Sequence, residues 1–406
     1  MRKLRNLLFF AAVGLGAAVP VACADDGDNV VRTRPDGGDA SADAANDGPA
    51  PNTLTCGVMI PATYESPNFA LNAKEELDLK GRVIALLAKM QSAEGATPMP
   101  VTTADLNAIF TAGTPSLRSI ATAYAQATID AYLVQFGDAA TKTWKPTDVE
   151  ADGGAGDGGA DDGGVATANA GGKYDNASIV NPIGVNLREA TEKVLLDGSL
   201  YNYALQLASG VVTEATVDRL VAIYGATPKF ANSADDAGAD TDTLIAEYAA
   251  NRDNKTGAPG HYRRIARALL VAKTAAAAGG MCQSDLDSAL KIFFLEWEKT
   301  AYSSAIYFLN QASTNAVAIP QKGDPALSAY GAALGFIESF KGIPQDRRLI
   351  TDVQIDGLLT RIGADKPYRL VTQSGDVVSA FSTAYQEIGG IYGFTQTEIE
   401  DSKKLY

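Results

Sequence analysis

The sequence predicts an all-α fold, a multi-helix bundle interrupted by disordered Asp/Gly-rich inserts. Apolar residues recur at helical spacing along most of the chain, N-capping patterns precede several of these segments, and convincing alternating strands are absent. Such a chain folds by burying one apolar stripe of each helix against its neighbours.

The first element is a predicted signal peptide over residues 1–24. A basic stretch precedes an apolar run that ends at Val21, and this run is too short for a mature membrane-spanning helix. Cys23 follows a small residue as in the lipobox of bacterial lipoproteins, although Pro20 stands where Leu is usual. We therefore expect lipidation of Cys23 and a lipid anchor in the cell envelope, at the outer membrane. The alternative is cleavage after Ala24, which gives a soluble periplasmic or secreted protein.

Residues 25–53 form a predicted disordered acidic tether, because Asp, Gly and Ala dominate and large apolar residues are almost absent. Loss of the signal peptide removes three positive charges and changes the net charge from -14 to -17. This charge argues against nucleic acid as a partner. It also predicts that membrane contact comes from the N-terminal lipid and not from a basic surface.

Two cysteines remain after Cys23 leaves the fold, and we predict that Cys56 and Cys282 form a disulfide. In the chain-entropy model, closing so long a loop contributes on the order of 5 kcal/mol. The alternative is a pair of buried free thiols.

The helical domain is predicted over residues 54–406. In the first long segment, from about residue 73, the apolar face contains Val83, Leu86, Leu87 and Met90. Further helical segments are predicted at 117–137, 187–209, 241–251, 260–278, 284–312, 325–340 and 376–392.

Local patterns mark where several helices start and stop. Thr351 with Gln354 and Thr395 with Glu398 fit the capping box. Short helices that start at Thr103, Thr213 and Thr351 are predicted to end near Gly113, Gly225 and Gly363. Asp/Gly-rich inserts near 145–175 and 231–240 are predicted to be disordered loops because of their low-complexity composition. The first insert is similar to a Gly-Asp calcium repeat, but it lacks the apolar position that lets such repeats stack.

The motifs of common enzyme classes are missing. With one histidine, the chain has no multi-histidine zinc site, and it contains no H-E-x-x-H, G-x-S-x-G or phosphate-binding G-x-x-x-x-G-K sequence. We assign no catalytic residue, metal ligand or cofactor, and we favour a non-enzymatic protein while unusual carboxylate chemistry stays open.

A first candidate binding group surrounds the single histidine, where basic residues gather at the start of a predicted helix. Its members are Arg252, His261, Arg263, Arg264 and Arg267. Together with the helix N-terminus they are suited to a carboxylate or phosphate. The alternative, which we favour, is that the arginines pair with acidic side chains of neighbouring helices.

A second candidate group lies in the aromatic segment that starts at Phe293. Its members are Glu296, Trp297, Glu298 and Tyr302. A carboxylate in so apolar a helix must be paired or have a raised pKa, and it suits a hard cation or a ligand amine. We favour the alternative, a satisfied structural network.

Several segments together resemble a known family. They are Tyr64 with Phe69, Arg82, Asn251-Arg252-Asp253, Trp297-Glu298, Ile306-Tyr307-Phe308-Leu309-Asn310 and Phe336-Ile337-Glu338-Ser339-Phe340-Lys341. From about Cys56 to Tyr406 the chain resembles an uncharacterised family of exported bacterial lipoproteins, domain of unknown function four-eight-five-six. The resemblance implies a helical, distantly imelysin-like protein. Members of the family are often found beside imelysin-like proteins and outer-membrane receptors associated with iron uptake.

Imelysins carry the motif G-x-H-x-x-E, which this chain lacks. Around His261, Pro259 stands at the glycine position and Arg264 at the glutamate position. The resemblance therefore implies no metal, peptidase or catalytic residue here.

Three functions follow as hypotheses. The first is a non-enzymatic envelope lipoprotein that binds a small ligand or an envelope protein, with a link to iron or metal acquisition. The second is an imelysin-like hydrolase that uses Glu296 and Glu298. The third is a passive envelope scaffold.

Overall fold

The computed structural model describes residues 52–147, 149, 171–175, 177–230, 242–253, 258–318 and 320–406. The predicted signal peptide, nearly all of the predicted tether, the central part of the first predicted insert and the whole of the second insert lie outside the described residues.

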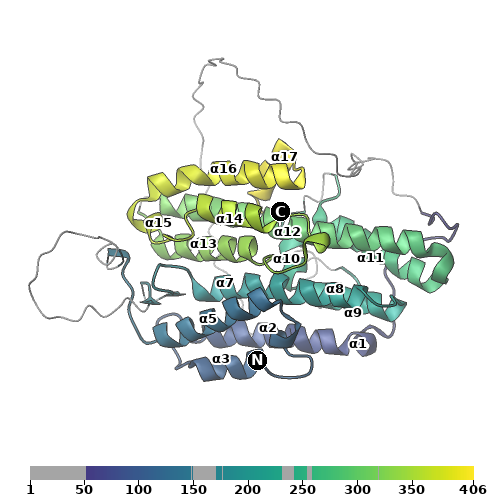
Figure 1. The fold of residues 1–406 in the computed structure, drawn as a ribbon, viewed down its shortest axis with the longest axis horizontal. Coiled ribbons are helices and arrows are strands. Elements are labelled where there is room, and N and C mark those ends of the chain that lie inside the picture. Colours follow the sequence, from purple (N-terminus) through teal and green to yellow (C-terminus); the bar gives the residue numbers. More distant parts are fainter. Residues whose placement is uncertain are drawn as a thin grey trace, which may run out of the picture. The chain divides into compact units, whose positions relative to one another are not determined.

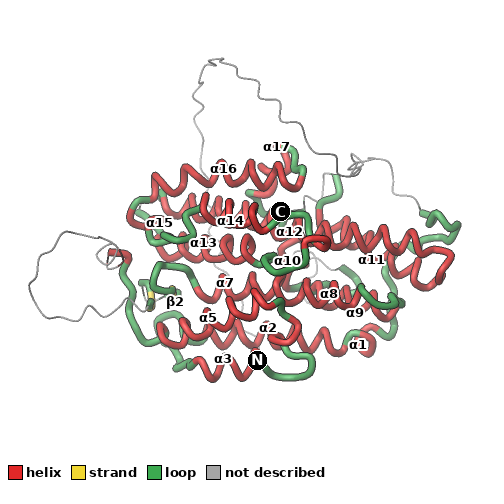
Figure 2. Tube along the Cα trace, in the orientation of Figure 1, coloured by secondary structure: helices red, strands yellow, loops and turns green. Residues whose placement is uncertain are grey.

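The all-α prediction is confirmed, because helices make up nearly all the regular structure of the described residues (Figures 1 and 2). The first half contains α1 (Phe69–Asn72), α2 (Lys74–Gln91), α3 (Thr103–Phe110), α4 (Leu117–Ile120), α5 (Ala123–Ala139), α7 (Leu187–Val194), η1 (Leu195–Tyr201), α8 (Asn202–Ala208), α9 (Glu214–Tyr224) and α10 (Leu244–Ala250). The second half contains α11 (His261–Ala278), η2 (Gly279–Cys282), α12 (Gln283–Ala316), α13 (Gly323–Glu338), η3 (Gln345–Arg347), α14 (Asp352–Arg361), α15 (Arg369–Thr372), α16 (Ser374–Tyr392) and α17 (Gln396–Ser402). Two short antiparallel strands, β1 (Gly172–Lys173) and β2 (Ile179–Val180), pair Gly172 with Val180.

Helix α12 organises the core. It has 34 residues and packs against α10, α11, α13 and α16. Helix α13 contacts α7 as well as α14, and α14 also contacts α16 (Figure 1). Two fully buried side chains of α12 show this: Trp297 packs on Tyr201 and Tyr224 of the first half, and Tyr302 packs on Phe340 and Tyr392 of the second half.

Helices α11 and α12 pack side by side and are joined by η2. The stretch His261–Ala316 is long and apolar enough to cross a membrane by length and composition alone. Its apolar residues include Leu269, Phe293 and Leu309, which are completely buried in the core. These residues give the stretch a role in the core, so its length and composition are weak evidence for a membrane span.

The predicted disulfide is confirmed. Cys56 and Cys282 are bonded, with their Cα atoms 5.3 Å apart, and are separated by 226 positions in the sequence. Beside the bond, Thr55 donates from its backbone N and its Oγ1 to Asp285 at 3.0 and 2.8 Å. The start of the described chain is thereby held at η2 and the beginning of α12.

Several predicted boundaries hold, and others shift for local reasons. Thr351 and Thr395 form the predicted capping boxes, and Gly225 ends α9 with a φ of 97°. The predicted helix 117–137 is wrong as one unit, because the Thr122 side chain accepts from the N–H of Ala125 and starts a new helix. Helix α3 is likewise capped by Thr102, one residue before the predicted Thr103.

Candidate functional site

The structure joins the two predicted binding groups at one point, which we call the His261 cluster: His261, Arg264 and Glu296. His261 Nδ1 lies 2.6 Å from Glu296 Oε2, and Arg264 Nε donates to the same oxygen at 2.9 Å. Arg264 Nη2 is 3.0 Å from His261 Nδ1. Helix α11 thus places a basic residue and the histidine directly against the carboxylate of α12.

Opposing effects set the charge of Glu296. Burial alone would raise its pKa, but the hydrogen bond and charge of His261, with the charges of Arg264 and Lys299, lower the pKa to about 2. The carboxylate is therefore ionised at neutral pH. Because Arg264 occupies the same oxygen that faces His261, a cation binding between the imidazole and this carboxylate would meet a guanidinium.

The start of α11 is occupied by the chain's own anion. Asp253 accepts from the backbone N of Gly260 at 3.3 Å and from the backbone N and Nε of Arg263 at 3.0 and 2.8 Å. A Cβ on Gly260 would lie 2.8 Å from the Asp253 carboxylate, so glycine permits this close approach. The predicted anion at this helix N-terminus is therefore Asp253 itself.

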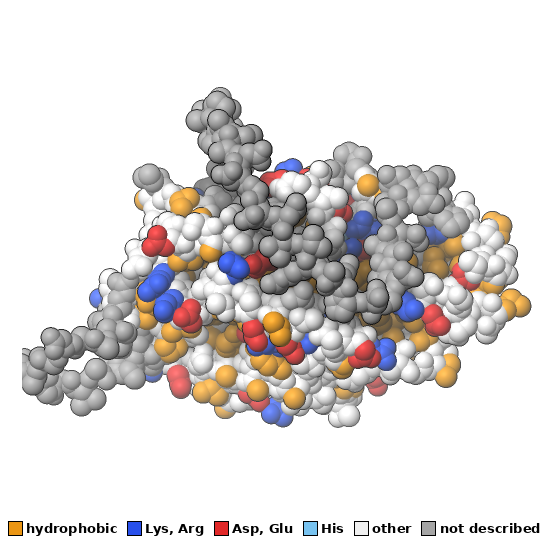
Figure 3. Space-filling model, turned by 45° about the horizontal axis from the view of Figure 1, so that its top comes forward, with side chains coloured by type: hydrophobic (Ala, Val, Ile, Leu, Met, Phe, Trp, Pro, Cys, Tyr) orange, Lys and Arg blue, Asp and Glu red, His pale blue; other side chains and the backbone are white. Residues whose placement is uncertain are grey.

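Arg267 lies one turn after Arg263 on the same helix and is partly buried. Burial lowers its pKa. On the face drawn in Figure 3, Lys and Arg side chains are scattered among Asp and Glu side chains. Within the first predicted group, His261 and Arg264 share Glu296 as a partner, whereas Arg263 pairs with Asp253.

The second predicted group divides in the same way. Trp297 Nε1 donates to Asp197 at 3.0 Å, and the Tyr302 hydroxyl donates to the Ile337 carbonyl at 3.0 Å. These side chains belong to the core and to the bonding between α12 and its neighbours.

The two glutamates of α12 serve different neighbours. Glu298 accepts from the backbone N–H groups of Leu349 and Ile350 and from the Tyr392 hydroxyl, the last at 2.7 Å. Side chains two positions apart on a helix point about 200° apart. Glu296 and Glu298 therefore face different neighbours, and the hydrolase hypothesis stays a prediction.

The buried carboxylates that were not predicted as site residues include Asp197 and Glu338. Asp197, in the π-helix η1, accepts from Trp297 and from Ser339 Oγ at 3.0 Å, and burial raises its pKa to about 7. Glu338 accepts from the hydroxyls of Tyr132 and Tyr124 at 2.6 and 3.3 Å, and burial also raises its pKa to about 7. An acidic residue inside an otherwise apolar helical stripe was the available signal for both.

Arg252 has unusual surroundings. The residue is only 8% exposed, and its guanidinium lies 4.5 Å from the centre of the Tyr307 ring. Nη1 donates to the Tyr248 carbonyl at 2.9 Å, whereas Nε has no hydrogen-bond partner. Burial lowers the pKa of Arg252 to about 10, so the side chain is still charged at neutral pH. Among the described residues, no carboxylate forms an ion pair with it.

One group of potential metal ligands occurs among the described residues, at the disulfide. Ligand atoms of Cys56, Cys282 and Asp285 lie close together. Both sulfurs are consumed by the disulfide, and the Asp285 carboxylate accepts from Thr55. The grouping is explained by the bond and its neighbouring hydrogen bonds.

Comparisons with models of protein families, with curated proteins and with solved structures find no match for this chain. The resemblance to the lipoprotein family and its imelysin-like relationship therefore stay predictions.

Proposed function

We propose that this chain is an exported, lipid-anchored protein of the cell envelope, whose helical domain binds a ligand or partner without catalysing a reaction. One observation carries the binding role: Arg252 is a buried cation with no acidic partner among the described residues. By contrast, the side chains suited to acid or base chemistry form hydrogen bonds within the protein. Glu296 is bonded to His261 and Arg264, and Glu298 accepts from two backbone N–H groups. The export signal and Cys23 support the location.

Replacement of Cys23 by serine is expected to release the protein from the membrane fraction. Without an acyl chain, nothing offsets repulsion between an acidic surface and anionic lipid. Fractionation of cells that produce the wild type or Cys23→Ser, followed by detergent phase partition, measures this. A wild-type protein found wholly in the soluble fraction would contradict the lipid anchor and support cleavage after Ala24.

The iron component of the proposal derives from the family resemblance and has its own test. A deletion strain is expected to take up less iron than its parent when iron is scarce, and the reintroduced gene should restore uptake. Uptake of labelled iron under starved and replete conditions measures this. Equal uptake by both strains in both conditions would remove the iron link and leave the binding role in place.

A further inference from the structure

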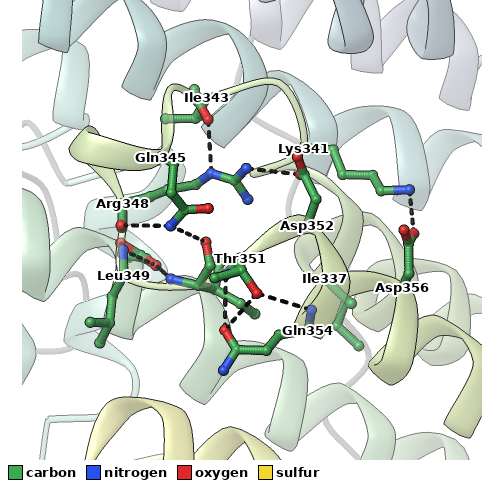
Figure 4. Close-up of polar contacts among 12 residues, drawn as sticks. Ile337, Lys341, Ile343, Gln345, Arg348, Leu349, Thr351, Asp352, Gln354 and Asp356 are labelled. Atoms are coloured by element: carbon green, nitrogen blue, oxygen red, sulfur yellow. Dashed lines mark hydrogen bonds and ion pairs between the residues drawn. The ribbon is translucent and has the colours of Figure 1, made fainter. Parts of the chain in front are cut away.

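Three cationic residues are buried among the residues that the structure describes: Lys193, Arg252 and Arg348. Lys193 Nζ lies 2.8 Å from Glu192 and 3.2 Å from Glu189. Arg348 donates from Nε to the Ile343 carbonyl and from Nη2 to Asp352, both at 2.8 Å (Figure 4). Arg252 is the one of the three without a carboxylate partner.

Arg252 and Lys193 lie against the same two aromatic rings. Their cationic groups are 5.7 and 5.0 Å from the Tyr248 ring centre, and 5.7 and 5.5 Å from that of Phe308. The acidic side chains of this region, Glu189 and Glu192, form ion pairs with Lys193. The Tyr248 hydroxyl also donates to Glu192 at 2.8 Å. Two cations therefore contact the same pair of aromatic rings, but only Lys193 has carboxylates that neutralise its charge.

A buried charge without a counter-charge is costly. The Tyr307 ring and the Tyr248 carbonyl offset part of this cost for Arg252, and its position just after the C-terminus of α10 also favours a cation. These contacts leave Nε, inside the protein, without an acceptor. An unsatisfied buried donor is itself unfavourable, so a bound acceptor would lower the free energy of the site.

The geometry of the guanidinium indicates which acceptor fits. Nη1 is used by the Tyr248 carbonyl, and the opposite edge, formed by Nε and Nη2, has no hydrogen bond to a described residue. This edge presents two parallel N–H groups that match two oxygens of one carboxylate or phosphate.

We propose that Arg252 binds a small oxyanion, the carboxylate or phosphate group of a ligand, through its Nε and Nη2 edge. This proposal deepens the binding role proposed above and rests on it. The nearby carboxylates of Glu189 and Glu192 and the net charge of -14 disfavour a polyanion, so the ligand carries one anionic group. The Tyr307 ring supports the guanidinium from its face and keeps the edge in place.

Thermal unfolding of the full-length protein tests this directly. We expect inorganic phosphate or acetate to raise the Tm of the wild type above its value in chloride at equal ionic strength, because a ligand that binds only the folded state stabilises it. Arg252→Met should lose this rise, and calorimetric titration should show binding weakened at least about tenfold. A rise with phosphate alone or acetate alone supports the proposal and identifies the oxyanion.

Two further variants separate binding from structure. Arg118→Met removes an exposed arginine that already has Asp130 as its partner, so it should keep the anion-dependent rise in Tm. Arg252→Lys keeps the charge but lacks the two parallel N–H groups, so it should retain only weak binding. If Arg252→Met does not fold, Arg252→Lys replaces it in these measurements. Equal Tm values of the wild type in chloride, acetate and phosphate would overturn the proposal, as would an equal rise in wild type and Arg252→Lys. Neither result bears on the membrane fractionation of Cys23→Ser.

Discussion

Removal of the Cys56–Cys282 disulfide is expected to lower the free energy of unfolding by about 2–5 kcal/mol. The bond joins positions 226 apart, so the oxidised unfolded chain is closed into a very long loop. Opening that loop increases the conformational entropy of the unfolded chain and leaves the folded contacts in place. Urea unfolding with and without reductant measures the difference through the fluorescence of Trp144 and Trp297, both buried in the folded protein.

The double variant Cys56→Ser/Cys282→Ser provides the control. Its unfolding midpoint should match that of the reduced wild type and should not respond to reductant. The hydrogen bonds from Thr55 to Asp285 remain in the variant, so a loss of stability would report the covalent link. An unchanged midpoint in wild type whose free thiols have been verified by mass spectrometry would contradict the prediction.

Features governed by local sequence were predictable. The helix predicted at 260–278 is found at His261–Ala278, because a glycine precedes it, glycines follow it, and its apolar spacing is regular. The capping boxes at Thr351 and Thr395 depend on residues three positions apart and formed as predicted. The disulfide was predictable because two cysteines remain after Cys23 in a chain that the sequence predicts to be exported.

Features that depend on tertiary partners could not be predicted from the sequence. The sequence marks His261 and Glu296 as separate candidates, yet they are 35 positions apart and only the packing of α11 on α12 brings them into contact. Arg252 and Arg263 looked equivalent in the sequence. Their environments differ because Asp253 bonds to Arg263, while Arg252 packs on Tyr307. Asp197 was missed because its partners Trp297 and Ser339 come from α12 and the end of α13.

Between pH 5 and 7.5, the free energy of unfolding is expected to rise as the pH falls. Burial raises the pKa of Asp197 and of Glu338 to about 7, whereas both lose their protons near pH 4 in the unfolded chain. In this window the folded state binds more protons than the unfolded chain. The stabilisation of the folded state by these protons is therefore complete below the unfolded pKa and is lost as the pH rises through 7. Glu296, whose pKa is lowered to about 2, acts in the opposite direction only below about pH 4.5.

The variant Asp197→Asn isolates one of these carboxyls. Its Oδ1 still accepts from Trp297, and its Nδ2 can donate to Ser339 Oγ, which continues to donate to the Phe336 carbonyl. The neutral amide cannot ionise, so we expect Asp197→Asn to be more stable than wild type at pH 7.5. The change in unfolding free energy between pH 5 and 7.5 should shrink by about 2–3 kcal/mol.

Urea titrations of both proteins at several pH values measure this change. Asp138→Asn makes the same chemical substitution at an exposed position and should retain the pH dependence of the wild type. A wild-type protein that becomes more stable from pH 5 to 7.5, or an Asp197→Asn variant with an unchanged pH dependence, would refute the prediction. The second result would mean that the two hydrogen bonds to Asp197 compensate its burial, so that the π-helix carries a stable charge in the core.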